Sequence, residues 1–207
     1  KLTIHQKGAG NGKTFGIWKS IAENIDKKTY IIITKQHSAK TVIYHELNEQ
    51  AKRHEYHIEY LEDLSNEHTK KHYIVKYRHK TSKRDCIVII GTIDSFIYNL
   101  ASKDCLSDNI FKSMRLNLAK YGPDKIHSES GSMKFGGQNI FLNKQCEIWI
   151  DEAQDLDETY LHALTRLMLD TGVEIQIVGD KLQSLSCENN FLTLLASDNG
   201  LPNIDIV

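Results

Sequence analysis

Residues 7–14 have the sequence KGAGNGKT, and this glycine-rich segment is the strongest structural signal in the chain. It follows Leu2–His5, an apolar segment that predicts a strand, and it runs into Lys13–Asn24, which predicts a helix. Glycine lets the backbone turn tightly between the two elements and aim its N–H groups at one point. Because the helix N-terminus adds partial positive charge there, the segment predicts a loop that binds phosphate groups. The alternative is a glycine-rich turn that holds no nucleotide.

The residues at the end of this loop suit the chemistry of a nucleoside triphosphate. The Lys13 ammonium can reach the β- and γ-phosphates, and the Thr14 hydroxyl can ligate Mg²⁺. The general pattern of such loops has glycine where Lys7 stands, and later glycines supply the turn instead. We therefore expect ATP and Mg²⁺ as cofactors, with the nucleotide bound by Gly8, Ala9, Gly10, Asn11, Gly12, Lys13 and Thr14.

A second motif, CEIWIDEAQD, places two carboxylates directly after an apolar strand predicted over Glu147–Ile150. At the carboxyl end of a parallel strand these groups would face the phosphate loop. Asp151 would hold Mg²⁺, through water, and Glu152 would orient and deprotonate the water that attacks the γ-phosphate. The alternative is an acidic start to the next helix, with Asp155 or Asp157 as its N-cap, and the two interpretations are compatible.

Strands and helices alternate along the rest of the chain. Further strands are predicted at Tyr30–Ile33, His72–Tyr77, Ile87–Ile90, Val173–Val178 and Ile204–Val207. Further helices are predicted at Ser38–Ala51 with Ser38 as N-cap, at Asn190–Ala196, and around an apolar face of Leu156, Tyr160, Leu164, Leu167 and Met168. Residues 101–145 contain loop-forming Gly and Ser, which predicts an insertion with helical pieces in one domain spanning 1–207. The expected fold is α/β, a parallel sheet with helices on both faces.

The composition is that of an ordinary globular protein, with 40% hydrophobic and 26% charged residues among 207. No segment approaches the roughly 18 apolar residues that a membrane span needs, and the first residues show no signal peptide. The cysteines are far apart and form no metal or disulfide spacing, which predicts reduced thiols in an intracellular protein. They are Cys86, Cys105, Cys146 and Cys187.

The charge is unevenly distributed, although its formal total is only −1. An acidic stretch between Glu55 and Glu67 precedes a basic run between Lys70 and Arg84 that contains no acid. The run has two interpretations: a solvated hairpin, or a surface that contacts nucleic acid.

DEAQD followed by VGDKLQS, residues 178–184, resembles motifs II and III of superfamily 1 helicases, most closely the UvrD/Rep-like branch. The phosphate loop is similar to that of the same branch. IIGTIDSFIY (89–98) and ITKQHSAK (33–40) lie where the family has segments that contact single-stranded nucleic acid. Asp94 stands where the family usually has histidine, and Phe15 replaces an arginine that often follows GKT.

This resemblance implies a RecA-like P-loop NTPase, the first motor domain of a helicase that moves on single-stranded DNA or RNA. It implies that Gln154 couples the nucleotide state to a neighbouring domain, that Gln183 senses the γ-phosphate, and that Asp180 lies in the same sensor loop. It places strand contacts at Thr34, His37, Thr92 and Ser95. A second RecA-like domain, outside this sequence, would supply an arginine finger and part of the adenine site.

Two other functions are compatible with these motifs. The first is a P-loop ATPase with a mechanical or regulatory role other than unwinding, which nucleic-acid-stimulated ATP hydrolysis would distinguish. The second is a binding module without catalysis. The joint presence of Lys13, Thr14, Asp151, Glu152 and Gln183 argues against the second.

Overall fold

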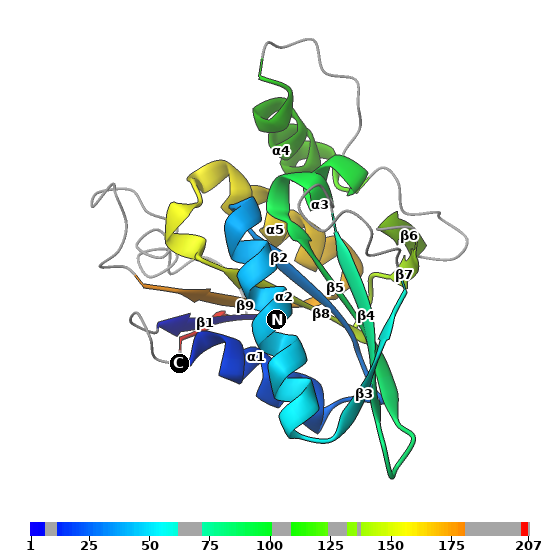
Figure 1. The fold of residues 1–207 in the computed structure, drawn as a ribbon. Coiled ribbons are helices and arrows are strands. Elements are labelled where there is room, and N and C mark those ends of the chain that lie inside the picture. The colour runs from blue at the N-terminus through cyan, green and yellow to red at the C-terminus, as the bar shows by residue number, and fades with distance from the viewer. Residues whose placement is uncertain are drawn as a thin grey trace.

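The computed structural model describes residues 1–6, 12–61, 72–100, 109–123, 132–135, 138–180 and 204–206. Within them, eight strands form one central sheet (Figure 1). In order across the sheet they are β10 (Ile204–Ile206), β1 (Leu2–Gln6), β9 (Glu174–Gly179), β8 (Cys146–Asp151), β2 (Thr29–Thr34), β5 (Asp85–Thr92), β4 (Tyr73–His79) and β3 (Tyr56–Tyr60). Neighbours from β10 to β5 are parallel, and β4 is antiparallel to β5 and β3.

Helices cover both faces of the sheet, which confirms the predicted α/β architecture. The helices α1 (Lys13–Glu23) and α2 (His37–Arg53) pack on one face, and α3 (Ile93–Leu100), α4 (Ile110–Tyr121) and α5 (Glu158–Thr171) pack on the other. The strand β2 shows why two cores form. Its residues Tyr30 and Ile32 pack with α1 and α2, whereas Ile31 and Ile33 lie in the core under α5. A continuous apolar run suits such a strand because both of its faces are buried.

The sheet is antiparallel at one edge, which the sequence did not predict. Only five residues, 80–84, separate β4 from β5. Parallel neighbours need a crossover of a dozen or more residues, so this short connection forces a hairpin. The edge strand β3 was not predicted, because much of Tyr56–Tyr60 is exposed and its sequence, YHIEY, has no apolar run.

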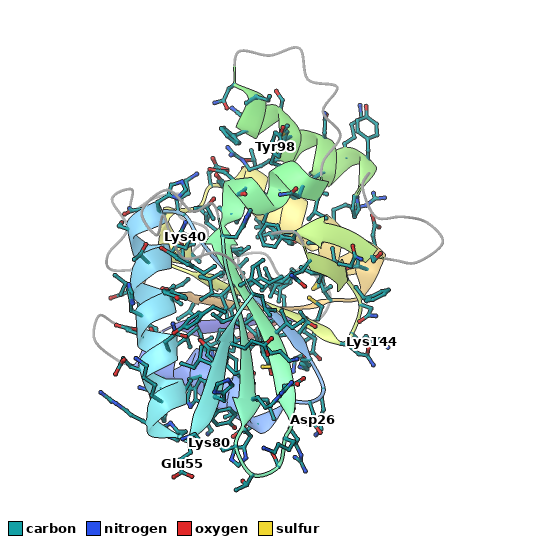
Figure 2. The ribbon with its side chains drawn as sticks, turned by 45° about the vertical axis from the view of Figure 1, so that its right-hand side comes forward. Asp26, Lys40, Glu55, Lys80, Tyr98 and Lys144 are labelled. Carbon is teal, nitrogen blue, oxygen red and sulfur yellow. The ribbon has the colours of Figure 1, made fainter. Side chains whose placement is uncertain are left out.

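The basic run lies largely on this hairpin. Lys76 is 3.4 Å from Asp85 and 4.0 Å from Glu59, and Arg78 is 3.1 Å from Asp85. The turn itself lies near Glu55, whose carbonyl oxygen accepts a hydrogen bond from the backbone N–H of Lys80 at 3.4 Å (Figure 2). These pairings within the sheet support the solvated-hairpin interpretation.

The N-caps of α5 and α2 can be compared with those predicted from the sequence. Asp157 caps α5, because its side chain accepts a hydrogen bond from the backbone N–H of Thr159 at 2.9 Å. The N-cap of α2 is Gln36 and not Ser38, and it makes no side-chain capping bond. The helix begins earlier than predicted because the chain leaves β2 through a tight turn, in which the Thr34 hydroxyl donates to the Gln36 carbonyl oxygen at 2.7 Å.

Residues 101–145 contain the helix α4 and a hairpin of β6 (Ser132–Phe135) and β7 (Gln138–Phe141). The helical piece was predicted and the hairpin was not. Both pack on the main core: Met114, Leu118, Met133 and Ile140 are buried in the same apolar cluster as the strands. Among the described helices, none combines the length and apolar character that a membrane span requires.

This packing makes α4 a test of the domain organisation. Met114 is fully buried, whereas Leu116 on the same helix is 48% exposed. We expect Met114→Ala to lower the free energy of unfolding by about 2–4 kcal/mol, because it leaves a cavity in the shared core. Leu116→Ala should change it by less than about 0.5 kcal/mol. Urea unfolding followed by circular dichroism measures both. Equal midpoints for the two variants would contradict the shared core.

Candidate nucleotide-binding site

The site lies where the parallel strands end and α1 begins. Thr34 of β2 pairs with Asp151 of β8, so these strands reach the same edge of the sheet. The chain enters α1 through Gly12, whose φ of 69° lies in the left-handed region. A side chain there would be strained, which explains the glycine directly before Lys13. The first turn of α1 therefore faces the acidic end of β8.

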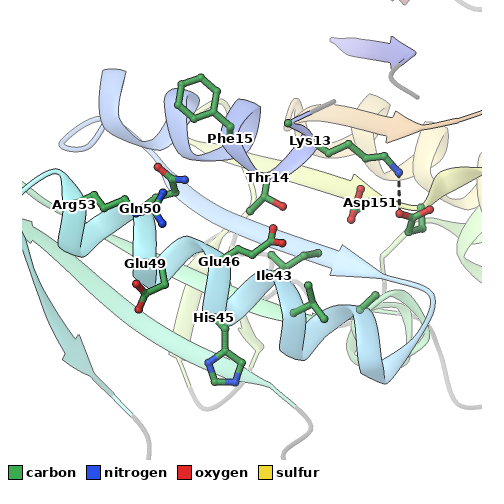
Figure 3. A pocket seen from close by; sticks show the side chains of 14 residues that line it. Lys13, Thr14, Phe15, Ile43, His45, Glu46, Glu49, Gln50, Arg53 and Asp151 are labelled. Carbon is green, nitrogen blue, oxygen red and sulfur yellow. Dashed lines mark hydrogen bonds and ion pairs between the residues drawn. The ribbon is translucent and has the colours of Figure 1, made fainter. Parts of the chain in front are cut away.

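An open pocket of about 800 Å³ extends from this edge along α1 and α2 (Figure 3). Five residues predicted to act on the nucleotide line it together: Gly12, Lys13, Thr14, Asp151 and Glu152. The predicted residues Gly8, Ala9, Gly10, Asn11 and Gln183 lie outside the described part of the chain.

Lys13 and Glu152 form an ion pair across the pocket. The Lys13 Nζ atom donates to Glu152 Oε1 at 2.8 Å, although the residues are 139 positions apart. Glu152 has a φ of 55°, a left-handed conformation that is uncommon for a residue with a side chain. Such strain costs on the order of 1–3 kcal/mol and concentrates at functional sites. The backbone there turns the carboxylate toward Lys13.

Asp151 is a buried carboxylate of the site that is only partly satisfied. Its side chain is buried, and its Oδ1 atom has no hydrogen-bond partner in the described structure. Burial, and then the negative charge of Glu152, raise the pKa of Asp151 to about 6, which Lys13 partly offsets. A buried oxygen without a donor is suited to a cation or to a water molecule that a cation holds.

The donors present fit Mg²⁺. No cluster of three or more His, Cys, Asp or Glu side chains suitable for a metal occurs in the part of the chain that the structure describes. Mg²⁺ does not need one, because it commonly takes one or two protein oxygens and completes its shell with water and phosphate. Thr14 and Asp151 line the pocket together and would supply those oxygens.

Gln154 joins two motifs that are separate in the sequence. It lies in a short 3₁₀ turn, Ala153–Asp155, and its side chain is 5% exposed. Its Nε2 atom donates to Glu152 Oε2, and its Oε1 atom accepts from the backbone N–H of Asp180 at 3.2 Å. One buried amide therefore connects Glu152, after β8, to Asp180, after β9.

A family model described as an AAA domain matches residues 1–189. The chain belongs to the AAA domain family. It is a P-loop NTPase domain, a class that typically binds nucleotide with Mg²⁺. Comparison with curated protein sequences gave no match.

The four residues of the AAA domain that are predicted to contact single-stranded nucleic acid differ in their surroundings. Thr34 is fully buried and donates to the Gln36 carbonyl, and the nearly buried Thr92 hydroxyl accepts from the backbone N–H of Ser95 at 3.4 Å. These two hydroxyls form hydrogen bonds within their own loops. His37 is exposed, and Ser95 lies 2.9 Å from His72 Nε2. Nucleic-acid contacts at all four residues stay predictions.

Asp94 organises a polar cluster that sequence reasoning missed. Its carboxylate lies 3.1 Å from Lys35 Nζ and 3.4 Å from an Arg115 nitrogen, and it accepts from the Tyr160 hydroxyl at 2.5 Å. Arg115 also lies 4.0 Å above the Tyr160 ring. The sequence signal for this cluster was Asp94 itself, which stands where the family usually has histidine. A carboxylate at that position needs cations nearby. The cluster links Lys35, directly after β2, to α3, α4 and α5 of the AAA domain.

The surroundings of Asp151 predict a cost in stability when no metal is bound. Its pKa is raised in the folded chain relative to the unfolded one, so the folded chain keeps a proton that the unfolded chain has released. Stability therefore falls as the pH rises from about 4 to 6, by on the order of 1–3 kcal/mol, and stays lowered above that window.

We expect Asp151→Asn, measured in EDTA, to raise the unfolding free energy at pH 7.5 and to raise it less at pH 5. Asp170→Asn is the control, because it removes only an exposed pair with Arg166 on α5 and should change stability by less than about 0.5 kcal/mol. Thermal unfolding at the two pH values measures both. A destabilised Asp151→Asn at pH 7.5 would contradict the unpaired buried charge.

Proposed function

We propose that this AAA domain is the ATP-binding motor domain of a helicase or translocase that couples ATP hydrolysis to movement along single-stranded DNA or RNA. The observation that carries the proposal is the buried Gln154 amide, which joins Glu152 to Asp180. A motor needs such a connection, because a change at the γ-phosphate must reach segments that contact other parts of the machine.

The chemistry follows from the lining residues. When a nucleotide enters, its phosphate oxygens compete with Glu152 for the Lys13 ammonium. Lys13 would then neutralise phosphate charge, and the freed Glu152 carboxylate would accept the proton of the attacking water. Thr14 and Asp151 would hold Mg²⁺, which, when bound, neutralises charge that develops on the phosphate oxygens. The exchange of partners by Lys13 thus prepares the general base.

Coupling would run through Gln154. When Glu152 changes partner, the hydrogen bond that Gln154 donates to it must rearrange, and the same amide holds the backbone at Asp180. We propose that a second RecA-like domain reads this change and supplies an arginine finger. Such a residue contributes roughly 10³- to 10⁵-fold to catalysis in P-loop enzymes.

One observation favours a second function, a P-loop ATPase with a non-helicase mechanical or regulatory role. The Asp94 carboxylate lies in the segment where the resemblance implies a nucleic-acid contact, and Lys35 and Arg115 are both engaged with it. A carboxylate repels a phosphate backbone, and paired cations are less available to attract one.

Nucleotide binding is the first test. We expect Lys13→Ala to weaken Mg²⁺-ADP binding by at least about tenfold, or about 1.4 kcal/mol. Lys19→Ala is the control: this lysine lies on the same helix, is exposed, and pairs only loosely with Glu23 at 3.9 Å. Titration calorimetry measures both affinities. Equal affinities for Lys13→Ala and wild type would contradict the assignment of the site.

The second test separates the two functions. In the protein that contains this domain together with its second motor domain, we expect single-stranded DNA or RNA to stimulate phosphate release. Glu152→Gln should nearly abolish that turnover, because it removes the general base. The same substitution should change little in the 207-residue chain alone, which we expect to hydrolyse ATP slowly. Turnover that ignores nucleic acid would favour the non-helicase ATPase.

A further inference from the structure

The helix α2 contributes a third carboxylate to the phosphate end of the pocket. Glu46 lines the same pocket as Lys13, Thr14 and Asp151. In Figure 3 its carboxylate points from α2 toward Thr14, and Asp151 lies to the right of both. Asp151 and Glu46 are close enough that the negative charge of Glu46 contributes to the raised pKa of Asp151. The two carboxylates therefore lie at the same end of the pocket as the hydroxyl that is expected to ligate Mg²⁺.

Glu46 is not engaged in holding the fold together. Within the described part of the chain its carboxylate makes no hydrogen bond and no ion pair, and the residue is exposed in the open pocket. Its neighbour Glu49, one turn further along α2, shows the contrast. Glu49 accepts from Lys52 Nζ at 2.7 Å, a pair on the helix surface. The described residues therefore provide no partner for the charged Glu46 carboxylate.

The charges at this end of the pocket are unsuited to a bare nucleotide. Glu46, Asp151 and Glu152 are acidic, and the lysine beside them, Lys13, is paired with Glu152. A nucleotide brings several further negative charges, and like charges held within a few ångströms repel strongly where water is partly excluded. The unpartnered Oδ1 of Asp151, which is only 7% exposed, independently marks where a positive ligand is needed.

We infer that Glu46 is a positioning residue for the divalent cation of the nucleotide, and that it accepts hydrogen bonds from metal-bound water beside Thr14. The inference rests on the proposed function, because it concerns the cation that accompanies the nucleotide. Mg²⁺ keeps several of its waters when it binds to proteins, so an acceptor in the outer shell has water protons to receive. Such outer-shell acceptors typically change metal affinity by about 10- to 100-fold.

A consequence is that Glu46 makes nucleotide binding depend on the metal. Its charge attracts the hydrated cation and repels a nucleotide that arrives without one. Removing the charge should therefore weaken binding with Mg²⁺ and strengthen binding without it. A residue that only supports the fold would shift both affinities in the same direction.

The experiment compares ADP binding to the 207-residue chain in Mg²⁺ and in EDTA by titration calorimetry. The measured quantity is the ratio of the dissociation constant in EDTA to that in Mg²⁺. We expect Glu46→Gln to reduce this ratio by at least about tenfold, in line with other outer-shell acceptors. Glu46→Asp, which keeps the charge on a shorter side chain, should restore part of the ratio.

Glu49→Gln is the matched control. It removes the same charge from the same helix, one turn further from Thr14, and should change the ratio by less than about twofold because the Glu49 carboxylate is already paired with Lys52. Thermal unfolding confirms that each variant is folded. An unchanged ratio for Glu46→Gln, or an equal reduction for Glu49→Gln, overturns the role of Glu46 while nucleotide binding stands. A wild-type chain that binds no ADP in either buffer overturns the proposed function and this inference together.

Discussion

The position of β8 between β2 and β9 is the constraint on which the site depends. All six residues of β8 are buried, and both neighbours are parallel to it. Parallel pairing brings the carboxyl ends of these strands to one edge, so the first residues after β8 emerge beside the start of α1. Lys13 can reach Glu152 because a strand that is fixed on both sides delivers the carboxylate to that point.

Two buried acids in β8 show the difference between a structural and a functional carboxylate. Glu147 is 2% exposed, and it accepts from Ser20 at 2.8 Å, from Trp149 Nε1 at 2.6 Å and from Lys28 at 2.5 Å. Those donors offset the desolvation of its charge. Asp151, four residues later in the same strand, leaves one oxygen without a donor. A buried oxygen without a donor does not stabilise the fold, but it can serve as a ligand for a cation.

Two sets of polar contacts connect the pocket and the helices around the sheet. Lys13 contacts Glu152, Glu152 accepts from Gln154, and Gln154 holds the backbone of Asp180. On the other face of the sheet, Asp94 and Tyr160 connect Lys35, directly after β2, to α3, α4 and α5. The contacts from Lys13 to Asp180 are made by polar groups that can exchange hydrogen-bond partners. In the Asp94 cluster, Lys35 and Arg115 also lie over the Tyr160 ring. These contacts hold the elements around the sheet together more rigidly.

The sequence by itself determined the α/β class, the parallel centre of the sheet and the residues that would meet at its edge. Apolar runs of four to six residues flanked by glycine or charge need two buried faces, and GNGKT and DEAQD carry their chemistry in residue type and order. Only the tertiary structure decided the antiparallel edge, the hairpin β6–β7, the partners of Asp94 and the position of Glu46 in the pocket. The reason is physical: exposed edge strands lack a periodic apolar signal, and a side chain's partners come from segments far apart in the chain. Lys13 and Glu152 could each be named from sequence, but their 2.8 Å contact depends on how the strands pair.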